Sequence, residues 1–506
     1  MVRLNASQLR IADYLALIGY LAVIIIVSKL SYRKQQTTEQ YHLAGKSMGV
    51  FPVLLSTIVT FFSGISFLGV PAWTFKNDLS FYMRTFSLLL VAPVLIYVMI
   101  PFYHRLNVQT AYEYLEQRFN REVRRFASAL FLLMRGLYLA VVIYASSLAV
   151  SVITGLSLKA TIAIIGLFCT TYTLMGGMKS VVWTQVTQFI VLVGGILVVF
   201  FSLLAKTEGN LSQMWASASE AGKLRLFHFT LDPTVDVAFA GIIIGTFFQN
   251  LALYGADQVA IQHYMTARSI GEIRRTIWLQ SLLVLPIVFF LHLIGLLLWL
   301  FYRQHPERLG ELPTVDYVMA YFVVRELPAG IPGLIFAGLL AATMAVTAGG
   351  LSGLSAASMN DFYRLTRADR DEGHYIRASR IFTLCWGAVA TGMAFFVDRL
   401  GILIEASVKI NTFFGGVLLG IFLLGMLSRR AGGGATLAAA AAGLAIVSYI
   451  GLLTKISFFW YAPIGCGVTM LVGYLISRQG TSLDAQATHR LVFRRPRLRA
   501  DQNGGG

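Results

Sequence analysis

Long apolar stretches alternate with short polar segments along almost the whole chain. Thirteen of these stretches are long enough to cross about 30 Å of hydrocarbon, which takes about 20 helical residues. They lie near residues 11–30, 50–75, 83–103, 126–154, 158–175, 180–205, 236–260, 276–302, 328–358, 380–398, 402–427, 435–454 and 457–477. The longest polar segments, 206–235 and 303–327, have the length of loops. The pattern predicts an all-α membrane protein with about 13 transmembrane helices and no separate soluble domain.

Composition agrees with a membrane location. The 506 residues are 57% hydrophobic and 13% charged, and no globular surface hides that much apolar area. The first apolar stretch begins at Ala12 without a small-residue cleavage site. We therefore expect a retained helix and not a removed signal peptide.

The net charge of +17 is distributed unevenly over the loops. If successive loops lie on opposite sides, one side holds 26 Lys and Arg residues and the other holds 13. The richer side is expected in the cytoplasm, which puts the N-terminus outside and the basic tail RRPRLR inside. This tail lacks interleaved aromatic residues, so the charge predicts a lipid bilayer and no nucleic acid as partner. The short basic tail and the absence of long extracellular domains favour a bacterial inner membrane.

Several classes of chemistry have no support in the sequence. The cysteines, Cys169, Cys385 and Cys466, lie inside predicted helices at no metal-ligand spacing. There is no GxxxxGK[ST] phosphate loop, which excludes an ATP-driven pump of that type. No nucleophile–base cluster is visible either, so we predict neither an enzyme nor a bound cofactor.

Two of the predicted helices are interrupted. The first, STIVTFFSGISFLGVPA, contains Gly64, Gly69 and Pro71, and the second, GIIIGTFFQNLALYGADQ, contains Gly241, Gly245 and Gly255. Unwound backbone survives in a membrane only where it lines a cavity, so paired breaks indicate a binding site near the midplane. The alternative is that glycine only lets helices pack closely.

The run YTLMGGMKSVVWTQ, with Gly176, Gly177, Lys179 and the Trp183–Thr184 pair, resembles the signature of the sodium:solute symporter family. Gln185 stands where that signature has an Asp. The segments FLGVPAWTF, TAYEYLEQRF at 110–119, DQVAIQHYMTARS at 257–269 and the NDFY that begins at Asn360 also resemble family elements, with His263 in place of the usual Arg. The chain is most similar in character to members that carry sialic acid, monocarboxylates or vitamins.

The resemblance implies a leucine-transporter-like fold with an inverted five-helix repeat. The expected organisation is an N-terminal helix within 1–49, repeats at 50–205 and 236–428, two further helices at 435–477 and a basic tail at 478–506. It also implies Na⁺ as a possible coupling ion, held by backbone carbonyls near Val59, Phe62 and Ala342. The side-chain oxygens of the family site are absent, because Ala345 and Val346 take the hydroxyl positions and Gln185 replaces the carboxylate. Thr347 and Ser352 supply a substitute only if the register shifts.

Polar side chains near the breaks are the candidates for binding the solute. They are Thr60, Ser63, Ser66, Arg135, Tyr138, Gln249, Asn250, Tyr254 and Asn411. Arg135 could hold a carboxylate bidentately, or it could extend toward the inner surface. Val259 takes the place of an aromatic gate residue of sugar-carrying relatives, so a sugar is not favoured over a carboxylate.

Other ionisable groups within the apolar stretches are candidates for coupling to a proton. They are Asp257, His292, Glu405 and Lys409. Each has a structural alternative: Asp257 as a cap at the helix break, His292 as a hydrogen-bonded core histidine, and Glu405 with Lys409 as a helical ion pair.

The sequence therefore predicts a secondary transporter that imports a small organic solute, with a carboxylate favoured. Sodium is the nominal driving ion, and proton coupling or uncoupled transport is the alternative. A hypothesis of another class is a sensor or partner subunit that has lost transport.

Overall fold

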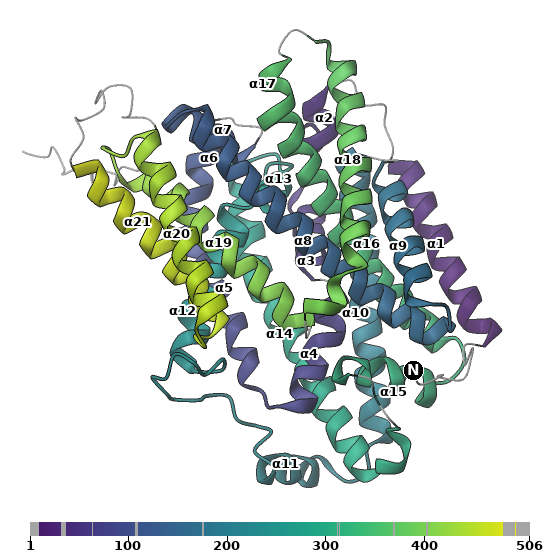
Figure 1. The fold of residues 1–506 in the computed structure, drawn as a ribbon. Helices are drawn as coiled ribbons and strands as arrows, with labels where there is room; N and C mark the ends of the chain where they lie inside the picture. Colours follow the sequence, from purple (N-terminus) through teal and green to yellow (C-terminus); the bar gives the residue numbers. More distant parts are fainter. Residues whose placement is uncertain are drawn as a thin grey trace, which may run out of the picture.

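The computed structural model describes residues 10–31, 37–62, 64–106, 110–174, 177–310, 312, 314–367, 370–400, 403–478 and 491. In these ranges the regular structure is helical, apart from two isolated β-bridges. Figure 1 shows the helices gathered in one bundle.

The apolar stretches form helices that can span a membrane. Eight helical segments of the described chain are long and apolar enough, and up to ten if each of two bent pairs is one span. The eight are Ser80–Tyr103, Arg121–Ser151, Met178–Lys206, Ile270–Gln304, Ile331–Thr366, Leu403–Leu427, Gly433–Leu453 and Phe458–Arg478. The chain is thus an integral membrane protein, whereas the number of thirteen spans stays a prediction.

The helices follow one another with short connections. The longer ones are α1 (Ile11–Ser31), α8 (Arg121–Thr154), α9 (Leu158–Leu174), α10 (Gly177–Lys206), α14 (Ile270–Gln304), α16 (Ile331–Ala357), α18 (Glu372–Ala394), α19 (Leu403–Leu427), α20 (Gly433–Leu453) and α21 (Tyr461–Arg478). Two bent pairs are α3 (Val50–Phe61) with α4 (Gly64–Lys76), and α12 (Phe239–Gly255) with α13 (Gln258–Tyr264). The shorter helices are α2 (Thr38–Leu43), α5 (Ser87–Val94), α6 (Ile100–Leu106), α7 (Ala111–Arg118), α11 (Leu211–Glu220), α15 (Val318–Glu326) and α17 (Arg364–Thr366). Short 3-10 and π segments include η2 (Ser80–Phe86), η3 (Leu95–Met99), η5 (Val315–Tyr317), η6 (Ser358–Tyr363) and η8 (Phe458–Trp460).

Helix α16 lies at the centre of the bundle. Its side chains are buried along almost its whole length, and it packs against α1, α3, α8, α9, α10 and α18. Helices α20 and α21 lie on one flank of the bundle and α1 and α9 on the opposite flank (Figure 1). Helix α21 packs closely on α19, because a Cβ atom added to Gly420 would lie only 2.7 Å from Cβ of Thr469.

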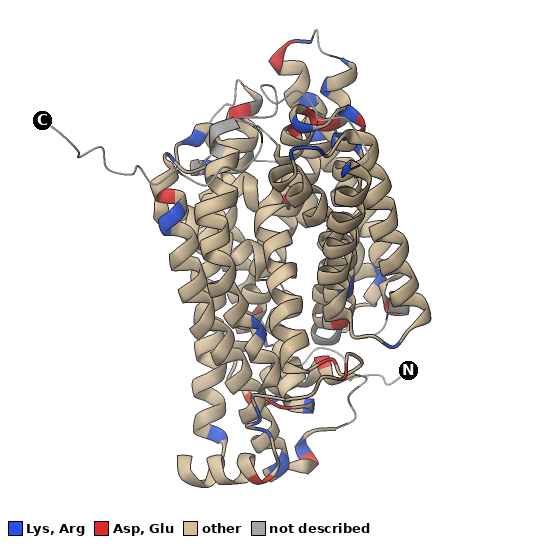
Figure 2. Ribbon diagram, turned by 90° about the vertical axis from the view of Figure 1, so that its left-hand side faces the viewer, with Lys and Arg blue, Asp and Glu red and all other residues tan. Residues whose placement is uncertain are grey.

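Charged residues gather at the two ends of the helices and leave the middle of the bundle largely uncharged (Figure 2). At one end Arg124, at the start of α8, donates to Asp361 (2.7 and 2.9 Å) and to Glu116 (2.6 Å). The Asp361 carboxylate also accepts bonds from Thr110 and Ser128. The family-like segments at 110–119 and 360–363 therefore meet at one buried cluster, which fixes α7 and η6 against α8.

Candidate solute-binding site

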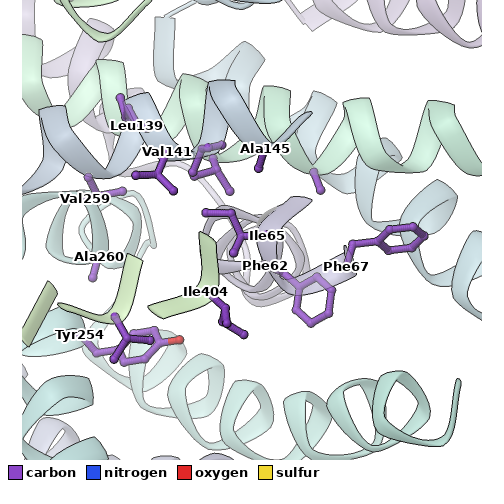
Figure 3. Close-up of a cluster of buried hydrophobic side chains, with 14 of the residues drawn as sticks. Phe62, Ile65, Phe67, Leu139, Val141, Ala145, Tyr254, Val259, Ala260 and Ile404 are labelled. Carbon is purple, nitrogen blue, oxygen red and sulfur yellow. The ribbon is translucent and has the colours of Figure 1, made fainter. Parts of the chain in front are cut away.

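Two broken helices cross the middle of the bundle, as the glycines predict. Helices α3 and α4 are bent by 59° and α12 and α13 by 58°. At the first break Phe62 has φ −104° and ψ 82°, and Ser63 lies outside the described residues. In Figure 3, Phe62 and Ile65 at this break gather with Val141 of α8 and Ile404 of α19.

Phenol groups satisfy the backbone carbonyls that the second break sets free. The Tyr103 hydroxyl donates to the carbonyl of Gly255 (2.7 Å), and the Tyr112 hydroxyl donates to that of Ala256 (3.3 Å). Asp257 caps the N-terminus of α13 through the amide of Val259 (2.8 Å), which confirms its predicted capping role. The break is thus a fixed part of the fold.

A cavity of about 120 Å³ lies beside the first break, between α3, α4, η2, α12 and α14. Its lining combines eight phenylalanine or aliphatic side chains with six polar ones, a mixture that suits a small organic molecule with a polar group. Its polar side chains are Ser66, Arg84, Thr85, Asn250, Tyr254 and His292. Three of these, Ser66, Asn250 and Tyr254, are among the solute-binding residues predicted from the sequence.

Arg84 is the cationic side chain of this cavity, and sequence reasoning missed it as a site residue. Its Cζ atom lies 4.7 Å from the centre of the Phe81 ring. No carboxylate of the described residues forms an ion pair with it. Because Arg84 stands at the edge of an apolar stretch, its sequence position suggests a loop residue. In the structure it lies on η2 and lines the cavity. The sequence feature that could have identified Arg84 is its position one residue inside the predicted span 83–103.

Arg135 has a different role from the one expected of a carboxylate anchor. Its guanidinium forms an ion pair with Asp257, and both side chains are buried, at 2% and 0% exposure. It also lies over the rings of Tyr138 (5.3 Å) and Phe61 (5.7 Å). The alternative of an arginine that reaches the inner surface is therefore wrong. The positive charge of Arg135 is thus already paired with a carboxylate of the chain itself.

The other predicted solute residues are spread over the core. Asn250 donates to Ser87 Oγ (2.7 Å), and Asn411 donates to the carbonyl of Ser407 (2.8 Å). The Oε1 atom of Gln249 and the Oδ1 atom of Asn411 are buried and have no hydrogen-bond partner within the described part of the chain. Asn250 lines the cavity, whereas Gln249 and Asn411 do not. The structure therefore brings together only some of the solute-binding residues that the sequence predicted.

A hydrogen-bonded network occupies the region where the family places sodium ligands. The Gln185 amide donates to Thr60 Oγ1 and to the Ala345 carbonyl, both at 2.9 Å. His263 Nε2 lies 3.0 Å from Thr60 Oγ1 and 3.3 Å from Gln185 Oε1. These contacts join α3, α10, α13 and α16. Val346 is buried here as an apolar side chain, and the Val59 carbonyl accepts the amide of Phe62 (3.2 Å).

The remaining coupling candidates also have partners within the chain. His292 Nδ1 lies 2.6 Å from Thr74 Oγ1, while its Nε2 atom is buried and has no hydrogen-bond partner among the residues that the structure describes. Glu405 and Lys409 form the predicted pair along α19, at 3.3 Å. That pair is partly exposed, which agrees with a structural role.

The chain matches known proteins over nearly its whole length. A model of the sodium:solute symporter family matches residues 41–443. The sodium/sialic acid symporter SiaT of Proteus mirabilis is 30% identical, over 91% of this chain and 94% of its own length. The sodium-coupled monocarboxylate transporter 1 of Mus musculus is also 30% identical, over 87% of this chain and 73% of its own.

A solved structure shares the fold. The substrate-bound, outward-open form of a Na⁺-coupled sialic acid symporter superposes with a TM-score of 0.88 at 27% identity, over 94% of this chain and 99% of that one. The architecture is therefore the leucine-transporter-like one, and the family consists of transporters and not of enzymes. With broken helices around a central cavity and these matches over its length, the chain belongs to the sodium:solute symporter family.

Proposed function

We propose that this chain imports a small organic carboxylate by alternating access, with the Arg84 guanidinium as the anchor of the solute. The observation that carries this proposal is a cation in the cavity beside the broken helices that lacks a carboxylate partner among the described residues. Guanidinium groups bind carboxylates through two parallel hydrogen bonds. Asn250, Tyr254 and Ser66 supply further polar contacts from α12 and α4.

The size of the cavity favours a short carboxylate. Its volume is about 120 Å³, somewhat less than the roughly 150 Å³ of an engineered cavity that holds benzene. A solute with few non-hydrogen atoms fits this conformation, whereas a sialic acid requires the cavity to widen. Among the relatives, the monocarboxylate transporter is named for a solute of the fitting class.

The test is ligand-induced thermal stabilisation of the purified protein with a panel of carboxylates and the matching neutral amides. We expect a short carboxylate to stabilise the protein and its amide to have little effect. Arg84→Gln should abolish this response, because it removes the charge and keeps a polar side chain. Arg303→Gln is the matched control, since Arg303 is exposed and packs on Trp299 away from the cavity. Equal responses of the two variants would contradict the proposal.

The identity of the driving ion has two candidates. Similarity to relatives that are named as sodium-coupled supports Na⁺. A carrier that works without sodium, through a proton or by the solute gradient alone, is favoured by the network at Gln185. There, the Gln185 amide donates to Thr60 Oγ1 and to the Ala345 carbonyl, so an N–H donor stands where the family signature has the carboxylate that a sodium ion would prefer.

Uptake into proteoliposomes under a sodium gradient, a pH gradient and neither gradient separates these candidates. If the network replaces the ion, uptake is independent of sodium. Gln185→Asp should then create a response to sodium, since it removes the amide donor and restores a carboxylate. Gln185→Glu controls for charge alone. Sodium-driven uptake by the unaltered chain would support the first candidate, and no uptake under any gradient would favour a non-transporting protein.

The orientation remains part of the proposal. We infer an N-terminus outside and a cytoplasmic C-terminus from the bias of Lys and Arg toward one set of loops. Cysteine labelling from either side of the membrane, at exposed positions on α11 and α17, tests this orientation.

A further inference from the structure

An apolar groove runs between α19 and α21 on the flank of the bundle. Its volume is about 720 Å³, within the range of sites for small molecules. Leu424 and Leu427 of α19 and Met470 and Leu471 of α21 form apolar walls. The groove is far from the solute cavity along the chain and shares no lining residue with it.

Three arginines form the polar end of this groove, where both helices end. Arg429 and Arg430 follow α19, and Arg478 is the last residue of α21. The lining residues include no Asp or Glu, and none of the three arginines has an ion pair with a described carboxylate. Three positive charges therefore border an apolar surface, and none of the described residues supplies an anion to balance them.

The loop that carries Arg429 and Arg430 is held in place from inside the protein. The guanidinium of Arg118, which is 3% exposed, donates to the carbonyls of Gly425 (3.1 Å), Ser428 (2.5 Å) and Ala431 (3.1 Å). Because these bonds fix the backbone on both sides of the two arginines, the basic end is a preformed feature of the surface.

We propose that this groove binds one anionic phospholipid. The phosphate pairs with Arg429, Arg430 and Arg478, and an acyl chain lies along the leucines and Met470. Arginine forks match phosphate oxygens, and basic pockets at the ends of transmembrane helices bind anionic head groups. A free phosphate would leave the apolar walls uncovered, whereas a phospholipid matches both the charge and the apolar length. The inference is independent of the transported solute.

The experiment titrates the full-length protein in detergent with phosphatidylglycerol and with phosphatidylcholine of the same acyl chains, and counts bound lipid by native mass spectrometry. We expect at least tenfold tighter binding of phosphatidylglycerol. The triple variant Arg429→Ala, Arg430→Ala and Arg478→Ala should lose this preference. Arg274→Ala with Arg275→Ala is the matched control, because these adjacent arginines are exposed on α14 away from the groove, and it should keep the preference.

A second variant tests the apolar part of the groove. Gly467 lines it, and a Cβ atom added there meets no atom of the described residues within 4 Å, so Gly467→Leu should project into the groove. We expect this variant to bind phosphatidylglycerol at least tenfold more weakly although all three arginines remain.

Three outcomes would overturn the proposal. The first is equal binding of the two lipids by the unaltered protein, and the second is an unchanged preference in the triple variant. The third comes from a photo-crosslinking benzoylphenylalanine placed at position 467: a crosslink to the C-terminal tail or to a second copy of the chain would identify a protein segment, and not a lipid, as the occupant. A crosslink to phosphatidylglycerol would support the proposal.

Discussion

The buried ion pair between Arg135 and Asp257 allows a quantitative test of how this core is built. Asp257 has two roles, since its carboxylate caps α13 through the amide of Val259 and neutralises Arg135. Asp257→Asn keeps an acceptor for the cap, because Asn is as good a cap as Asp. It removes only the charge, and leaves a guanidinium that is 2% exposed without a counter-ion. Loss of one partner of a buried pair costs about 3–5 kcal/mol.

Replacement of both partners should cost much less than loss of one. Arg135→Met in the Asp257→Asn background removes the uncompensated charge and keeps a long side chain, and neutral replacements of whole buried pairs are often close to neutral in free energy. We therefore expect the double variant to recover most of the stability that Asp257→Asn loses. Because the cycle subtracts the costs of both single variants from that of the double variant, the coupling energy should have a magnitude of at least about 3 kcal/mol.

The assay is unfolding of the purified protein in detergent, followed for the two single variants and the double variant. A loss below about 1 kcal/mol for Asp257→Asn, or a double variant less stable than both single ones, would refute the reasoning. If a carboxylate solute stabilised Asp257→Asn more than the unaltered protein, Arg135 and not Arg84 would be the better anchor. The same samples thus test the assignment of the two arginines.

Three further predictions rest on single contacts. Asp361→Asn should reduce the free energy of unfolding by about 1.5–3 kcal/mol, because Arg124 loses a buried charged acceptor. Glu116→Gln should cost less, because Glu116 is the partly exposed partner of Arg124. Denaturation of both variants checks this difference. Burial, and next the charge of Glu405, raise the pKa of Asp316 to about 6, above its value in the unfolded chain. Protonation of Asp316 therefore stabilises the fold fully at a pH below the unfolded pKa, and this stabilisation is lost as the pH rises through about 6. The melting temperature of Asp316→Asn should thus vary less between pH 7 and pH 5 than that of the unaltered protein. Gly420→Leu should destabilise the protein by about 1–3 kcal/mol, because the new side chain overpacks against Thr469. Thermal unfolding measures this loss, and a change near zero would mean that α21 moves aside.

Local features of the structure followed from the sequence, and contacts between distant segments did not. Glycine and proline in two apolar stretches predicted the two breaks, and spacing along one helix predicted the pair of Glu405 and Lys409. Arg135 and Asp257 are 122 positions apart, and nothing in either segment indicates that the other neutralises it. A single sequence shows which charged side chains raise the free energy of a helix in a membrane. Only the packing of α8 against the second break shows that Arg135 and Asp257 offset this free energy by pairing with one another.

That distinction also explains why Arg84 is the best functional candidate among the membrane charges. A charged residue at the centre of a membrane helix costs about 2.5–3.5 kcal/mol. Arg135 and Lys409 each have a carboxylate within the chain, so their cost is offset whether or not a solute is present. Arg84, which lies near the end of its predicted span, has the face of Phe81 and the cavity beside it, and no carboxylate of the described residues pairs with it. If an anionic solute binds there as proposed, it reduces this cost, and the free energy of solute binding should then include the neutralisation of this cation. We therefore expect a carboxylate to bind more tightly than an uncharged solute of equal shape, with selectivity for charge arising from an arginine that no carboxylate of the described residues neutralises.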